Sequence, residues 1–577
     1  MNRWLRGLLL AASALVLLLA GWLWWNRPRP VDMATYAPAD ALVYLEANSL
    51  PAVLEGLTST DAWRALAPAA GLRADAGQLG WLSRAAAWTG VGPAEYVLLA
   101  RAQVAVAVVG FEAAEEPEQA LHIKPRAALL VETHTSQRRA QPALEKLLGN
   151  FARRANGAAE PTRRTAGDAA IVVWPNTRGG LPVVAAFADT LAVIGNDEEA
   201  VTTCLAVRRG ERAALANDPQ LAEMRERMRA DDALAFGYVP AAGARRLLAV
   251  AALAYAGQFA SDQKAQSAAA ILLPQLAARL LGGAAWSARV ADGAVTDTYF
   301  VAVPAGPPAR LSAALAPADE QTFDAARLLP ADAYQLTRYD FRDPEAAWRE
   351  LHAALSAHLE VTIAPLVDRF LDEALTPFGV TEPREFLRAA GPEIATVRLS
   401  ETGEGPLLVA RVRDREALRA LARKHGGRGE RLGAAEFWAG AGEEGTAAGF
   451  VGDYVLLGDA EAVRRCLTEG ANGRTLAESE AFKRAAGAAA SAEPAGIVTL
   501  TDERDAARAF VNMMARQSAL RSGAQPNDAA FRRALDARAY AVSATRPVEG
   551  GFERRTRSAF GQFGTIAGQF APAAAGH

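Results

Sequence analysis

Paired histidines are the first feature of this sequence that could bind a metal ion. A zinc peptidase places two histidines four residues apart, in the pattern His-Glu-x-x-His, so that both reach the ion from one helical face. The sequence lacks this pattern, and His352 and His358 are six residues apart, which turns them toward different faces of an expected helix. The acidic run at 112–118 leaves two interpretations open, a solvated loop and a divalent-cation site. Such runs are usually solvated loops, so we predict no metal ligand.

Motifs for nucleophiles and phosphate groups are also missing. Ser261 and Lys264 have the spacing that puts an amine one helical turn from a hydroxyl, but the Ser-Asp-Asn and Lys-Thr-Gly motifs of penicillin-binding proteins are absent. There is no Gly-x-Ser-x-Gly elbow, no Gly-x-x-x-x-Gly-Lys-Ser/Thr loop, and no Gly-x-Gly-x-x-Gly after a strand at the start of a βαβ unit. Cys204 and Cys466 stand among Leu and Val, where a free cysteine packs as a small apolar side chain. We predict two unpaired, buried cysteines, no catalytic residue and no cofactor-binding residue.

Composition narrows the class of protein. The 577 residues carry a net charge of −3, and 51% of them are hydrophobic. A nucleic-acid surface would need a basic stripe, so no nucleic-acid partner is predicted. Two cysteines are too few for a disulfide scaffold or a cysteine-based metal cluster. A chain of this length exceeds what one core supports, so at least two domains are expected.

The N-terminus predicts membrane attachment. Residues 5–25 are apolar over about 20 positions, enough to cross a bilayer as a helix. Arg3 and Arg6 stand before the uninterrupted apolar run of this segment, and three tryptophans stand at its far end, where indole rings favour the interface. A cleaved signal peptide is the alternative, although the expected small-x-small cleavage site is missing. We predict a transmembrane anchor and stalk over 1–30 in the bacterial inner membrane, single-pass, with the soluble region in the periplasm or elsewhere outside the cytoplasm.

Two other apolar stretches, 246–260 and 268–283, resemble membrane spans less closely. The first is too short to cross a bilayer, and the second contains Pro274 and Arg279. Buried or amphipathic helices are expected here, and a pocket lining or a face lying on a membrane is the alternative.

The region after the anchor contains an internal repeat. Phe187 matches Phe450 and Gly195 matches Gly458, both at an offset of 263 residues. The same order of matches continues along the chain, at Cys204 and Cys466, 38–41 and 330–333, Trp63 and Trp348, and 286–306 and 540–561. A repeated order of this kind is typical of duplication. We predict two copies of one unit, over 37–310 and 325–565.

Each copy is expected to combine strands with helices. Runs of β-branched residues predict strands at 104–111, 127–135, 170–175 and 182–195. Apolar residues at helical spacing predict helices at 343–360 and 415–425. The predicted fold class is α+β: two tandem copies of a mixed or antiparallel sheet unit covered by helices, after one N-terminal transmembrane helix.

These motifs resemble a known bacterial family. The Pro-Ala-Asp-Ala-Leu-Val-Tyr-Leu opening at 38–45, the later strand-Gly-Asp-x-x-Ala-Val pattern and the short Leu-Ala segment after it are similar to the domain of unknown function 3352 family. The resemblance covers most of residues 37–565. It implies a membrane-attached or exported bacterial protein, and it brings no known activity and no site residues.

Two classes of function follow. The favoured class is a non-catalytic envelope module that binds a protein, lipid or polymer through its sheets and the groove between the repeats. The alternative is an envelope hydrolase or transferase whose site is assembled from dispersed residues. The predicted partners are the membrane, through residues 5–25, and an envelope protein or lipid. An elongated apolar cavity would favour lipid binding, whereas a cleft with converging polar groups would favour enzyme chemistry.

Overall fold

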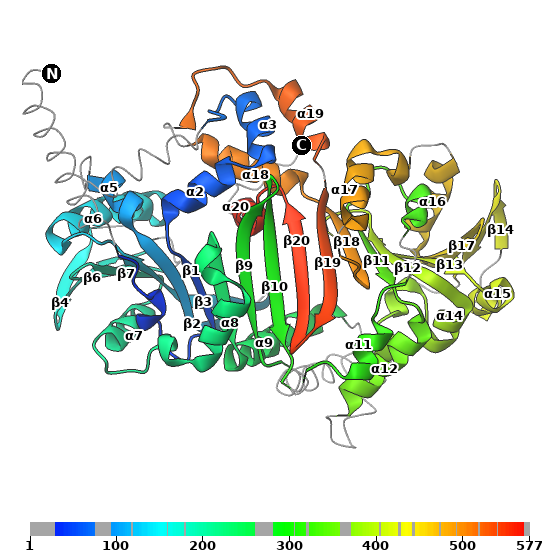
Figure 1. The fold of residues 1–577 in the computed structure, drawn as a ribbon, viewed down its shortest axis with the longest axis horizontal. Coiled ribbons are helices and arrows are strands. Elements are labelled where there is room, and N and C mark those ends of the chain that lie inside the picture. The colour runs from blue at the N-terminus through cyan, green and yellow to red at the C-terminus, as the bar shows by residue number, and fades with distance from the viewer. Residues whose placement is uncertain are drawn as a thin grey trace, which may run out of the picture. The chain divides into compact units, whose positions relative to one another are not determined.

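The computed structural model describes most of the chain, and its described residues form an α+β fold. The described residues are 29–75, 94–116, 119–157, 160–177, 181–259, 281–304, 306–318, 322–357, 371–402, 405–424, 429–440, 445–471, 475–491, 493–516, 520–538 and 540–569. Their strands pair antiparallel (Figure 1). The chain divides into two compact units: unit 1 is Met1–Ser59, Ala74–Gly243 and Ala285–Arg289, and unit 2 is Thr60–Arg73, Ala244–Ala284 and Val290–His577.

Unit 1 is an antiparallel sheet with helices in the connections between its strands. Its elements are η1 (Met33–Thr35), β1 (Val43–Ala47), α2 (Leu50–Thr58), α5 (Ala94–Arg101), β2 (Gln103–Glu116), β3 (Gln119–Glu132), α6 (Gln137–Asn156), β4 (Thr162–Ala166), β5 (Ala169–Trp174), β6 (Val183–Ala188), β7 (Leu191–Gly195), α7 (Glu198–Arg208), η2 (Leu215–Asn217), α8 (Pro219–Arg227), η3 (Ala230–Asp232) and β8 (Ala235–Pro240). The strands pair in the order β8-β1-β2-β3-β7-β6-β5-β4. Helix α9 (Ala241–Phe259) and strand β9 (Gly283–Ala291) follow in the chain. The Leu234 amide donates to the Ala288 carbonyl at 2.8 Å, which places β9 beside β8.

Unit 2 repeats this scheme and adds helices. Its elements are α3 (Asp61–Ala69), β10 (Ala294–Ala302), α11 (Ala309–Ala314), η4 (Asp324–Leu328), β11 (Gln335–Asp340), α12 (Pro344–Ser356), η5 (Thr376–Phe378), α14 (Pro383–Ala389), β12 (Ala390–Arg398), β13 (Leu407–Val412), α15 (Arg415–Lys424), β14 (Gly429–Leu432), β15 (Ala435–Ala439), β16 (Thr446–Val451), β17 (Tyr454–Asp459), α16 (Ala460–Ala471), η6 (Leu476–Glu478), α17 (Glu480–Ala490), β18 (Ile497–Asp502), α18 (Arg504–Ala515), α19 (Asp528–Asp536), β19 (Tyr540–Val548), β20 (Gly551–Ser558) and α20 (Gly561–Gln569). The strands pair in the order β10-β20-β19-β18-β11-β12-β13-β17-β16-β15-β14.

The strand order β8-β1-β2-β3-β7-β6-β5-β4 therefore recurs as β18-β11-β12-β13-β17-β16-β15-β14. The register agrees as well. Val193, in the middle of β7, and Leu456, in the middle of β17, are both fully buried between the equivalent neighbouring strands. Gly195 and Gly458 lie at the ends of these two strands. Val193 and Leu456 therefore occupy equivalent environments, as two copies of one unit would place them.

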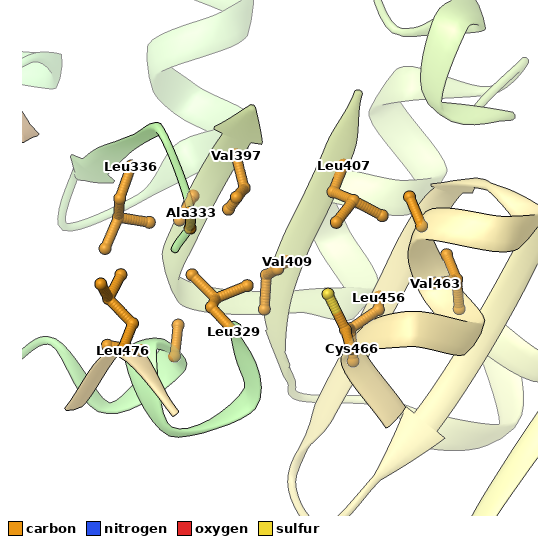
Figure 2. Close-up of a cluster of buried hydrophobic side chains, with 14 of the residues drawn as sticks. Leu329, Ala333, Leu336, Val397, Leu407, Val409, Leu456, Val463, Cys466 and Leu476 are labelled. Carbon is orange, nitrogen blue, oxygen red and sulfur yellow. The ribbon is translucent and has the colours of Figure 1, made fainter. Parts of the chain in front are cut away.

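The core beneath β13 and β17 shows how the strands and the cysteine helix pack (Figure 2). Leu407 and Val409, two residues apart on β13, point to the same side of the sheet because successive side chains of a strand alternate. Leu456 of β17 joins them, and Val463 and Cys466 of α16 cover the same cluster. The five side chains are fully buried. The repeated motif therefore supplies the contact between a helix and the sheet.

The predicted fold class must be corrected at the N-terminus. No helix within the described residues is long and apolar enough to span a membrane. The two longest described helices, α6 and α9, each contain charged residues, among them Arg245 and Arg246 in α9. The first element within the described residues is η1, and the strand pairings of defined register are all antiparallel. The segment 5–25 lies outside the described residues, and the ranges 1–30, 37–310 and 325–565 stay predictions.

The predicted equivalence of Trp63 and Trp348 is wrong. Trp348 lies in α12, the first helix after β11, whereas Trp63 lies in α3, the second helix after β1. Helix α2, which follows β1 directly, is the counterpart of α12. Trp63 is fully buried and Trp348 only partly so. The shared Trp-Arg dipeptide therefore matched two different helices.

Strands β10 and β20 pair about a local two-fold axis. Thr298 and Arg555 lie opposite each other in the antiparallel ladder. These two residues are 257 positions apart in the sequence, and so are Gly293 and Gly550, the turn glycines that precede the two strands. Because the pair at the centre consists of equivalent positions, the ladder has the same register from either strand. One face of this strand pair forms part of the cleft described next.

Candidate functional site

The residues that the sequence suggested for chemistry do not assemble into a site. His352 is buried in α12 beside the ring of Trp348, while His358, Ser261 and Lys264 lie outside the described residues. The acidic run at 112–118 is not the expected loop, because β2 continues through residue 116. Within the described part of the chain, no cluster of three or more His, Cys, Asp or Glu side chains is arranged to hold a metal ion.

Both cysteines are structural. Cys204 in α7 and Cys466 in α16 are free and fully buried, as predicted. Burial raises the pKa of each thiol to about 12, because the charged thiolate would lose its hydration. Nucleophilic cysteines need the opposite shift, since the thiolate is the reactive form.

We expect both thiols to resist a disulfide reagent such as dithionitrobenzoate in the folded protein at about pH 8. At that pH only about one in ten thousand such thiols is ionised, against roughly a quarter for an ordinary cysteine. Two thiols should react once the protein is unfolded in urea. As a control, Thr468→Cys introduces an exposed thiol two residues from Cys466 and should react at once. Rapid labelling of the native wild type would show that the thiols are accessible.

A cleft of 920 Å³ in unit 2 is the candidate site. Four adjacent strands, β18, β19, β20 and β10, form its floor, and helices α18 and α20 contribute its walls. The polar side chains of the floor include Thr501, Asp502, Ser543, Arg554, Thr556, Ser558, Asp297 and Tyr299. Five hydroxyl groups, one guanidinium and two carboxylates therefore line the same space. Strand β10 comes from the predicted range 37–310 and the other three strands from 325–565, so neither repeat contains this floor alone.

Hydrogen bonds order the floor. The hydroxyl oxygens of Ser543 and Thr556 are 2.8 Å apart, and an Nη of Arg554 donates to the Ser543 hydroxyl at 3.1 Å. Gln562, at the start of α20, donates its side-chain amide to the Tyr299 hydroxyl. Burial and the charge of Asp297 raise the pKa of Tyr299 to about 12, so this hydroxyl keeps its proton. The floor thus presents both donors and acceptors at fixed positions.

Asp297 fixes the start of α20. Its Oδ2 accepts the Gln562 backbone N–H at 3.1 Å, and Ser558 accepts the Gly561 N–H at 2.9 Å. The φ of Gly561 is +59°, and a Cβ at this position would lie 2.6 Å from Asp297 Oδ2. Only glycine allows both the backbone angle and the close approach. A carboxylate at the N-terminus of a helix is also favoured by the helix dipole.

Glu503 holds the segment just before α20. Its two carboxyl oxygens lie 3.1 and 2.9 Å from the Ala559 backbone nitrogen, which donates to them. Burial raises the pKa of Glu503 to about 8, and the negative charges of Asp502 and Asp297 act in the same direction, against the Ala559 hydrogen bond. Glu503 is therefore a carboxyl group that exchanges its proton near neutral pH at the edge of the cleft.

Sequence reasoning missed this site because its members are far apart. Asp297 and Glu503 are separated by more than 200 residues, and no short motif contains both. One local signal was present. Arg554, Thr556 and Ser558 are polar at alternate positions of a strand, which indicates a polar face. That signal gives a strand face but not the helices that enclose it.

Comparisons with family models, curated proteins and solved structures found no match to this chain. The resemblance to the domain of unknown function 3352 family therefore stays a prediction.

Proposed function

We propose that the protein is a non-catalytic envelope module whose cleft in unit 2 binds a hydroxyl-rich polymer, such as a glycan strand. The main support is the floor itself, where hydroxyl donors and acceptors lie next to Arg554 and Asp297. Such a floor can replace the water around a sugar, because each ligand hydroxyl finds a partner. Asn512, Gln562 and Gln569 add side-chain amides that complement acetamido groups.

A lipid fits this cleft less well than a glycan. Burying an acyl chain against the floor would leave its hydroxyl and guanidinium groups without hydrogen bonds, which is costly. The apolar cavity near Trp438 is only about 50 Å³, too small for a lipid chain. The apolar stretch 268–283, the other candidate for a lipid pocket, lies largely outside the described residues. A membrane partner through residues 5–25 and an envelope location stay predictions.

The carboxylates support binding without catalysis. Asp297 and Glu503 accept backbone N–H groups that hold the start of α20, so both have structural tasks. One observation favours the alternative, an envelope hydrolase. A glutamic acid with a raised pKa next to a second carboxylate is the arrangement in which glycosidases keep a general acid protonated.

Glycan binding can be tested by calorimetric titration with a soluble oligomer of N-acetylglucosamine. Arg554→Ala should weaken binding about tenfold, the loss expected for a hydrogen bond from a charged group. Arg555→Ala is the matched control, because this neighbouring arginine points to the opposite face of β20. Equal losses in the two variants, or no binding by the wild type, would contradict the proposal.

The same samples test the alternative. Mass spectrometry of the oligomer after incubation should show chains of unchanged length. Shortened chains that disappear in the Glu503→Gln variant would establish hydrolysis and replace the binding proposal.

A further inference from the structure

Helix α6 in unit 1 carries an apolar surface that the repeated fold does not require. It has 20 residues, whereas α15, which follows the equivalent strand in unit 2, has 10. Leu147 and Phe151 are four residues apart and so share one helical face. They are 39% and 58% exposed. Leu99 of α5, the helix that packs on α6, is 49% exposed.

Basic residues run beside this apolar face. Helix α6 has five basic residues and one acidic residue. Arg139, Lys146 and Arg153 follow one another at seven-residue intervals, so they line one side of the helix. Arg154 stands one turn after Phe151, on the same face. Glu95 of α5 pairs with Lys146 at 2.8 Å, and Arg153 and Arg154 are both exposed.

An apolar stripe flanked by arginines and lysines is the pattern of helices that lie in a membrane interface. The apolar side chains enter the boundary between headgroups and acyl chains, while the basic side chains meet lipid phosphates. Each basic residue near an anionic surface raises partitioning about fivefold. Charge complementarity thus favours anionic lipid over neutral lipid. It also favours anionic lipid over a protein surface that carries few acidic side chains.

We infer that the α6 surface, made of Leu99, Leu147, Phe151, Arg153 and Arg154, docks on an anionic lipid bilayer. This contact needs no membrane insertion of the helix. It lies in unit 1 and is independent of the glycan cleft of unit 2.

The buried native cysteines make a direct test practical. Phe151→Cys in the full-length chain provides one accessible thiol for a fluorophore whose emission shifts to the blue in apolar surroundings. The labelled protein is mixed with vesicles of phosphatidylcholine alone, and with vesicles that also contain phosphatidylglycerol. We expect a blue shift with the anionic vesicles only. A Met513→Cys label, at an exposed apolar position in unit 2, is the control and should not shift.

A second variant tests the charges. Adding Arg153→Glu and Arg154→Glu to the Phe151→Cys chain should lower partitioning by roughly 25-fold or more, at about fivefold per basic residue. The absence of a shift with anionic vesicles would overturn the inference. So would an equal shift with neutral vesicles, or an emission that is already blue without vesicles, which would mean that protein covers this face.

Discussion

Trp63→Ala should destabilise unit 2 by about 3–5 kcal/mol, the cost of removing a large aromatic side chain from a packed core. Trp63 is fully buried in α3. Its ring packs edge-on against Phe510, with centroids 6.5 Å apart, and Phe510 stacks on Phe560 at 4.3 Å. The indole N–H also donates to the Arg73 carbonyl at 3.2 Å. The substitution therefore leaves a cavity and removes this hydrogen bond, and urea unfolding followed by circular dichroism measures the loss.

Trp348→Ala is the matched control. Trp348 is only partly buried, and its indole nitrogen has no hydrogen-bond partner among the described residues. Its removal should cost about 1–2 kcal/mol, because less surface leaves water on folding. Equal losses at the two positions would contradict the different environments of the two tryptophans.

The importance of Trp63 illustrates what the sequence could and could not predict. Residues 60–73 belong to unit 2, although they lie between two segments of unit 1. Backbone hydrogen bonds join them to residues 520–527, as between Arg73 N–H and the Leu520 carbonyl. This pairing spans more than 400 residues, and local periodicity does not report contacts over that distance. The sequence match of Trp63 with Trp348 therefore paired α3 with α12, although the counterpart of α12 is α2.

Single elements were predicted well where their pattern is local. The strand expected at 170–175 is β5, and the helix expected at 415–425 is α15. The run 182–195 was predicted as one strand but forms two, β6 and β7, because the chain turns at Asp189 with φ of +53°. Asp tolerates this left-handed conformation better than most residues. When both strands are buried, the residues on either side of the turn are apolar, so the sequence pattern does not indicate the turn.

Beyond the polar face of β20, the candidate site could not be predicted. Its floor depends on the pairing of β10 with β20, and its carboxylates bind the backbone of α20 rather than each other. These are properties of the assembled sheet. The sequence therefore supported a prediction of fold elements and of a repeat, while the cleft appears only when the distant strands come together.

Glu503→Gln should remove most of the dependence of unit 2 stability on pH between about pH 6 and pH 9. The pKa of Glu503 is raised from 4.5 to about 8 in the folded protein. Between these values the folded state holds a proton that the unfolded state has released, so the free energy of unfolding falls as pH rises and levels off above about pH 8. Between pH 6 and pH 9 the decrease should be roughly 2.5–3 kcal/mol, at about 1.4 kcal/mol per pH unit below the folded-state pKa.

Asp340→Asn is the control for this experiment. Burial raises the pKa of Asp340 to about 6, so its contribution changes between 3.8 and about 6 and is constant at higher pH. The control should therefore keep the wild-type slope between about pH 6 and pH 9, whereas Glu503→Gln should flatten it. Parallel slopes in the wild type and the Glu503→Gln variant would contradict the assignment of this titration to Glu503.

Glu503→Gln also separates the two proposed functions. Glutamine keeps a carbonyl oxygen that can accept the Ala559 N–H, so α20 should stay in place and the floor of the cleft should stay intact. Glycan binding should then match that of the wild type, and at alkaline pH the variant should be the more stable protein. Glutamine has no acidic proton to donate, so a hydrolase that uses Glu503 as its general acid would lose turnover while it kept binding.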